Sequence, residues 1–149
     1  MNPNDALRSL RYMLDVNDAK LVEIIALGGG NSSKSAVAAF LKRDDEEGYQ
    51  KCSDLVMAQF LDGLVVYKRG IDPSRPVQPL AKSVSNNLIC KKLRATYQLK
   101  DLQILALLGP SGLKISKAEI GAIFRAEGHR NYRECGDQLL RYLIKGLTA

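Results

Sequence analysis

The strongest constraint on the fold is an internal repeat, because the sequence matches itself at an offset of 83 residues, without a gap, from residues 4–66 to residues 87–149. Thirteen of the 63 aligned positions are identical, and the apolar positions agree along the alignment. Self-similarity at a fixed offset indicates the duplication of one structural unit. The identical pairs include Asn4/Asn87, Leu10/Leu93, Arg11/Arg94, Asp18/Asp101, Ser33/Ser116, Lys34/Lys117, Tyr49/Tyr132, Cys52/Cys135, Asp54/Asp137, Gly63/Gly146 and Leu64/Leu147.

Each copy contains four apolar segments with the three-and-four spacing of amphipathic helices. We therefore predict an all-α fold of two tandem four-helix units, which pack with pseudo-twofold symmetry because so small a unit is near the lower limit for standing alone. Aromatic residues make up only 6% of the chain and tryptophan is absent, so we expect a mainly aliphatic core. The residues that we expect to be buried include Leu10, Ile24, Phe40, Phe60, Leu93, Leu107, Phe124 and Leu143.

Polar residues mark the predicted helix starts. Asn4 and Asn87 stand where the first helix of each copy needs an N-cap. Ser33 and Ser116 precede the third helices, and Ser116 with Glu119 has the spacing of a capping box. An aspartate begins each fourth helix, where the helix dipole favours negative charge. The second helix of each copy is apolar nearly all round, which predicts a central position.

A connector without a core of its own is predicted between the two copies. Residues 68–86 contain three of the five prolines among scattered polar residues, as is typical of an extended linker. The predicted organisation is therefore a first helical unit at residues 1–67, this linker, and a second helical unit at residues 87–149.

Composition also predicts where the protein is found. No apolar run approaches the roughly 18 residues that cross a bilayer, and the N-terminal residues lack the pattern of a secretory signal. We therefore expect a cytoplasmic protein with no membrane partner. The three cysteines, Cys52, Cys90 and Cys135, are widely spaced and odd in number, which argues against a disulfide framework or a metal site. Reduced, mostly buried thiols are expected.

Several segments together carry a family resemblance. They are the Asn-x-x-x-x-x-Leu-Arg opening of each copy, the run KRDDEEGYQKC at 42–52 that leads to FLDGL, and the segment NYRECGDQ at 131–138. In these segments the chain resembles the YehS-like proteins, which are bacterial proteins built from two copies of a domain of unknown function. The resemblance covers essentially the whole chain, and it implies no catalytic or ligand-binding residue.

The repeated Tyr-x-x-Cys-x-Asp segment is the most specific candidate for chemistry. A thiolate at a helix N-terminus would be activated, but the cysteine can equally be a small buried residue next to an aspartate that caps the helix. We favour the structural interpretation, because neither copy has a base nearby and His129 is the only histidine. His129 and Cys135 are also too few ligands for a metal. The glycine-rich stretch at 28–34 lacks the spacing of a phosphate-binding loop. No enzyme activity, metal or cofactor is therefore predicted.

Positive charge is concentrated in the second half of the chain. Residues 1–69 carry nine Lys or Arg against ten Asp or Glu, whereas residues 70–149 carry thirteen against six, a net charge of +7. Such a region attracts polyanions, and nucleic acid (RNA or DNA) is the partner that we predict first. A helix-turn-helix is not indicated, because about nine residues separate the third and fourth helices. The candidate nucleic-acid-binding residues are Lys91, Lys92, Arg94, Lys117, Arg125, Arg130 and Arg133.

The loop before the fourth helix differs most in charge between the copies. Its acidic residues in the first copy are Asp44, Asp45, Glu46 and Glu47, which align with Glu127, Gly128, His129 and Arg130. The two loops could pair within the molecule or across a homodimer, could meet different partners, an acidic protein among them, or could simply be solvated. The alternative function is therefore a protein–protein interaction adaptor that uses these loops.

Overall fold

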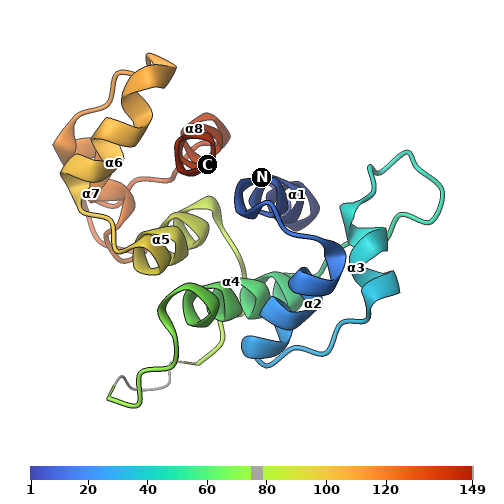
Figure 1. The fold of residues 1–149 in the computed structure, drawn as a ribbon. Helices are drawn as coiled ribbons and strands as arrows, with labels where there is room; N and C mark the ends of the chain where they lie inside the picture. Colours follow the sequence, from blue (N-terminus) through green and yellow to red (C-terminus); the bar gives the residue numbers. More distant parts are fainter. Residues whose placement is uncertain (75–78, 149) are drawn as a thin grey trace. The chain divides into compact units, whose positions relative to one another are not determined.

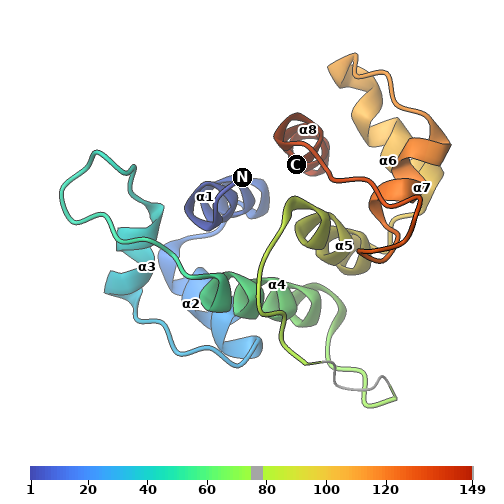
Figure 2. The same ribbon diagram turned by 180° about the vertical axis from the view of Figure 1, so that it is seen from behind.

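The computed structural model describes residues 1–74 and 79–148, and α-helices dominate this part of the chain. The chain divides into two compact units, unit 1 at residues 1–84 and unit 2 at residues 85–149. Among the described residues, each unit contains four α-helices. They follow the order that the repeat predicts (Figures 1 and 2). The prediction of an all-α fold made of two four-helix units is confirmed.

In unit 1, every helix begins behind a short polar residue whose side chain accepts a hydrogen bond from the backbone N–H three residues later. The core lies where α4 packs across α2 (Figure 1), and Leu21, Ile24, Phe60 and Leu64 are completely buried there. The helices of this unit are α1 (Pro3–Leu14), α2 (Asp18–Leu27), α3 (Lys34–Leu41) and α4 (Asp54–Arg69), with N-caps Asn2, Asn17, Ser33 and Ser53.

Unit 2 repeats this helix order, with a first helix of equal length and shorter second, third and fourth helices. The predicted capping box of Ser116 and Glu119 is present at the start of its third helix. Ile89, Leu93 and Leu140 form part of its buried core. The helices are α5 (Asn86–Tyr97), α6 (Asp101–Leu108), α7 (Lys117–Ile123) and α8 (Asp137–Leu147), and a short 3-10 helix, η1 (Gly109–Ser111), follows α6.

The predicted N-cap role of Asn4 and Asn87 is wrong. The caps are Asn2 and Ser85, and both asparagines lie inside the first turn of their helices with their side chains buried. Helix α1 begins two residues earlier than a cap at Asn4 would require, because Pro3 is well suited to the first helical position, where no N–H partner is needed.

Burial differs from the prediction at the second and third helices. Leu107 and Phe124 are only half-buried. The second helices are central, as predicted, since α2 packs on both α3 and α4 and α6 packs on both α7 and α8. They are not covered on all sides, however, because Leu27 is 46% exposed and Leu102 67% exposed. A unit with only three other helices cannot cover every face of a short apolar helix, because its surface is large relative to its volume. The other six residues expected in the core are buried.

The connector between the units is shorter than residues 68–86, because α4 continues through Lys68 to Arg69. In its described part, Ile71 is 80% exposed, and Pro76 lies outside the described residues. None of the helices in residues 1–74 and 79–148 is both long and apolar enough to cross a membrane.

Candidate functional site

A buried asparagine ties together three segments of unit 1. The side-chain nitrogen of Asn4 donates hydrogen bonds to the carbonyl oxygens of Phe40, at 3.0 Å, and Gln50, at 2.8 Å. Its side-chain oxygen accepts a hydrogen bond of 2.9 Å from the backbone N–H of Cys52. We call this set of three bonds the asparagine clasp. It fixes both ends of the loop between α3 and α4 to the first turn of α1.

Unit 2 contains the same clasp at the equivalent positions. Asn87 donates to the carbonyl oxygens of Ile123, at 3.0 Å, and Arg133, at 2.8 Å, and it accepts from the N–H of Cys135 at 2.8 Å. All four residues lie 83 positions after their counterparts. The identity of Asn4 with Asn87 and of Cys52 with Cys135 therefore reflects one structural device that both copies keep.

The two clasped loops share a set of backbone hydrogen bonds. We call residues 42–50 the acidic loop and residues 125–133 the basic loop. The acidic loop contains three backbone hydrogen bonds, from Glu46 to Arg43, from Tyr49 to Glu46 and from Gln50 to Ala39. The basic loop contains the same three bonds, from His129 to Ala126, from Tyr132 to His129 and from Arg133 to Ala122. The loops therefore share these hydrogen bonds but not every backbone angle, since the positive φ falls at Gly48 in the acidic loop and at Gly128 in the basic loop, which are not equivalent positions.

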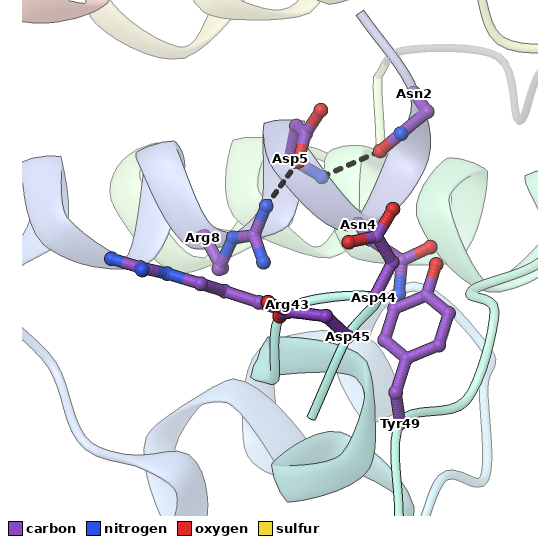
Figure 3. A pocket seen from close by; sticks show the side chains of 8 residues that line it. All are labelled: Asn2, Asn4, Asp5, Arg8, Arg43, Asp44, Asp45 and Tyr49. Carbon is purple, nitrogen blue, oxygen red and sulfur yellow. Dashed lines mark hydrogen bonds and ion pairs between the residues drawn. The ribbon is translucent and has the colours of Figure 1, made fainter. Parts of the chain in front are cut away.

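A polar cavity of about 280 Å³ lies between the acidic loop and the first turns of α1 (Figure 3). Within it, Arg8 forms an ion pair with Asp5 and donates a hydrogen bond of 3.0 Å to the carbonyl of Lys42. Among the predicted interaction residues, Asp44 and Asp45 line the cavity, and Glu46 and Glu47 do not. The lining consists of Asn2, Asn4, Asp5, Arg8, Arg43, Asp44, Asp45 and Tyr49.

The equivalent surface of unit 2 has the opposite charge. Lys91 occupies the position of Arg8, Leu88 that of Asp5, and Gly128 that of Asp45. Counting Lys, Arg, Asp and Glu, the acidic loop carries a net charge of −2 and the basic loop +2. His129 is exposed, and its Nδ1 accepts a hydrogen bond of 3.0 Å from the N–H of Asn131.

The seven predicted nucleic-acid-binding residues have different surroundings. Arg94 forms an ion pair with Asp101 at 3.3 Å and lies over the ring of Phe124, 4.7 Å from its centre. The equivalent residues of unit 1, Arg11 and Asp18, form the same ion pair. The pair of Arg94 with Asp101 is therefore a structural contact that both copies keep.

The other candidate residues are more accessible. Arg133 is exposed but pairs with Glu119 at 2.8 Å. Lys117, Arg125 and Arg130 are exposed, and Lys91 and Lys92 are half-buried.

The three cysteines are free and buried. Burial, together with the nearby Asp54, raises the pKa of Cys52 to about 11. In unit 2 the Sγ atoms of Cys90 and Cys135 lie 3.6 Å apart. The pair is not apparent in the sequence, because 45 residues separate its members. The one signal for it is that Cys90 replaces Leu7 of the first copy. Across residues 1–74 and 79–148, no three His, Cys, Asp or Glu side chains are grouped as a metal ion would require.

Comparison with known proteins agrees with the duplicated architecture. The model of a family described as "Protein of unknown function (DUF1456)" matches residues 3–70 and again residues 86–149. The chain belongs to this family. Over 149 residues it is 46% identical to the "Uncharacterized protein YehS" of Escherichia coli (strain K12), and the alignment covers 100% of this chain and 96% of that relative. The predicted resemblance to the YehS-like proteins is thereby confirmed. No solved structure matches the chain.

Proposed function

We propose that this member of the DUF1456 family is a non-enzymatic binding protein that binds nucleic acid, RNA or DNA, through unit 2. The observation that carries the proposal is the division of charge between the structural units. Unit 1 contains eleven Lys or Arg and eleven Asp or Glu, whereas unit 2 contains eleven against five, a net charge of +6. Cations clustered in one small domain attract phosphate backbones and release their counterions.

The basic loop supplies the surface that best fits this role. Arg125 and Arg130 are exposed on it, and Lys117 is exposed at the start of α7. Lys91 lies one turn after Asn87 on α5, hence beside the loop that Asn87 holds. The clasp fixes the backbone at the end of the loop that carries these side chains. Contacts with phosphates alone carry little sequence information, so we expect weak sequence preference.

Salt-dependent binding of a fluorescent single-stranded RNA tests this proposal. Removing the charges of Arg125 and Arg130 by Arg125→Gln and Arg130→Gln should reduce the magnitude of the negative slope of log K against log salt by about 1.4, since each phosphate contact contributes about 0.7 on a single strand. The matched control removes two exposed charges from unit 1 by Lys34→Gln and Lys51→Gln, and it should bind like the parent. Equal weakening by both double variants, or binding that does not depend on salt, would refute the proposal.

A second candidate function, a protein–protein interaction adaptor, is favoured by the cavity at the acidic loop. Asp44 and Asp45 line this cavity of about 280 Å³ and could receive a basic segment of a partner. A pull-down from nuclease-treated lysate should then recover a partner that Asp44→Asn with Asp45→Asn releases. Glu46→Gln with Glu47→Gln removes the same charge outside the cavity and should retain the partner. Loss of all partners after nuclease would exclude the adaptor function.

A further inference from the structure

Two buried thiols of unit 2 lie within reach of each other. Cys90 on α5 is 1% exposed, and Cys135, just before α8, is 6% exposed. Their Sγ atoms are 3.6 Å apart, so they need to approach by only about 1.5 Å to reach the length of a disulfide bond. A side-chain rotation can supply a shift of this size. The clasp holds the backbone of Cys135 through the 2.8 Å bond from its N–H to Asn87.

The two thiols are chemically different. Donation of the Cys90 S–H to the sulfur of Cys135 lowers the pKa of Cys135 and raises that of Cys90. Burial and the nearby Asp137 oppose this lowering of the Cys135 pKa, but the hydrogen bond from Cys90 outweighs them, so the thiolate forms first at Cys135, close to the N-terminus of α8. Cys135 is thus the nucleophile of the pair, and Cys90 is the thiol that can resolve an oxidised Cys135.

A cavity lies beside the chain segment that carries Cys135. Its volume is about 210 Å³, and its lining includes Glu134 and Gly136, the two neighbours of Cys135 in the chain, but neither Cys90 nor Cys135 itself. A molecule the size of water needs only about 30 Å³, and hydrogen peroxide is little larger. Lys114 and Arg133 also line this cavity.

Unit 1 lacks this arrangement although it has the same fold. Cys52 occupies the position of Cys135, and its N–H makes the same bond to the clasp asparagine. Leu7 occupies the position of Cys90, so Cys52 has no second thiol beside it, and its pKa is raised to about 11. Cys52 therefore serves as an internal control: it should not form a disulfide bond under conditions that link Cys90 to Cys135.

We propose that Cys90 and Cys135 are an oxidation site, at which hydrogen peroxide forms a reversible disulfide bond within unit 2. The Cys135 thiolate attacks one peroxide oxygen, so that an S–O bond forms, the O–O bond breaks and the departing hydroxide takes up a proton as water. The Cys90 thiolate then attacks the sulfur of this sulfenic acid. The S–S bond forms, the S–O bond breaks, and a second water leaves. Two thiols are oxidised and one peroxide is reduced to two waters. Two molecules of glutathione then reduce the disulfide by exchange and leave as glutathione disulfide.

Mass spectrometry of the native protein tests this proposal without reference to nucleic-acid binding. After treatment with hydrogen peroxide, the intact chain should lose the mass of two hydrogen atoms and two of its three thiols. Peptide mapping should place the link between Cys90 and Cys135 and leave Cys52 as a thiol, and glutathione should restore the starting mass. Oxidation of Cys52 at a comparable rate, disulfides only between chains, or no link under conditions that oxidise glutathione would each overturn the proposal.

Three variants assign the separate roles of the thiols. Cys90→Ser keeps a hydroxyl that can donate to the Cys135 sulfur but cannot form a disulfide, so it should stop the reaction at a Cys135 sulfenic acid that dimedone traps. Cys90→Leu restores the leucine of the first copy and removes the donor, so Cys135 should become as unreactive as Cys52. Cys52→Ser should form the link at the parental rate. Absence of a dimedone adduct in a Cys90→Ser variant that is folded by circular dichroism would contradict the assignment of Cys135 as the nucleophile.

Discussion

Gly63 of α4 lies so close to Ile24 of α2 that a methyl group on its Cα would meet the Ile24 carbonyl oxygen at 1.7 Å. In unit 2, a methyl group added to the Cα of Gly146 would lie 2.7 Å from the carbonyl oxygen of Leu107. Both copies therefore keep a glycine because two helix backbones touch there, more tightly in unit 1 than in unit 2.

Replacing these glycines by alanine should destabilise the two units unequally. Gly63→Ala requires α2 and α4 to separate, and we expect a loss of about 3 kcal/mol even after the gain of about 1 kcal/mol in helix propensity. Gly146→Ala needs a smaller shift and should cost about 1 kcal/mol. Urea denaturation followed by circular dichroism measures both values. A Gly63→Ala variant as stable as the parent would contradict the close approach of the two backbones.

Removing a clasp should cost more than removing a helix cap. Asn87→Ala leaves two carbonyl oxygens and the N–H of Cys135 without their partner, and we expect a loss of about 3 kcal/mol. The matched control is Ser85→Ala, which removes only the exposed cap of α5 and should cost about 1 kcal/mol. Amide hydrogen exchange adds a local check, because the Cys135 N–H should lose its protection in the Asn87 variant alone.

The raised pKa of Cys52 should make stability fall at alkaline pH. The unfolded chain releases the Cys52 proton near pH 9.0, whereas the folded chain holds it up to about pH 11. Between these values the folded state binds the extra proton, so the free energy of unfolding decreases as the pH rises. Other groups titrate in the same range, so the comparison is with Cys52→Ala, whose stability should fall less steeply between pH 9 and 11. Parallel curves for the two proteins would show that Cys52 ionises equally easily in both states.

Arg94 should act on stability and not chiefly on nucleic-acid binding. Its pairing with Asp101 and its position over Phe124 predict that Arg94→Gln destabilises unit 2 by about 1 kcal/mol. Lys91→Gln removes the same charge one turn earlier on α5 and should leave stability nearly unchanged. If Arg94→Gln proves as stable as Lys91→Gln and weakens RNA binding as strongly, Arg94 belongs to the binding surface.

Local patterns allowed the helices to be predicted, but not the contacts that join them. Apolar spacing and the Ser116 cap act within a few residues, so they can be recognised directly in the sequence. The role of Asn4 could not, because an asparagine near a helix start normally caps it, and its partners here lie 36 to 48 residues away. The same separation concealed the pairing of Cys90 with Cys135. The count of charged residues predicts that the second half is basic, but it does not show which cations are accessible. In the structure Arg94 is paired with Asp101, whereas Arg130 is exposed.

The asparagine clasp also has a consequence for the order in which the chain folds during synthesis. All three partners of Asn4 belong to residues 40–52, so the ribosome has already made every group of the first clasp before α4 is complete. The second clasp draws only on residues 87–135. Contacts within each copy keep the contact order low, which favours rapid folding. Unit 1 can therefore bury its asparagine while unit 2 is still being translated, and the nascent copies do not compete for each other's loops.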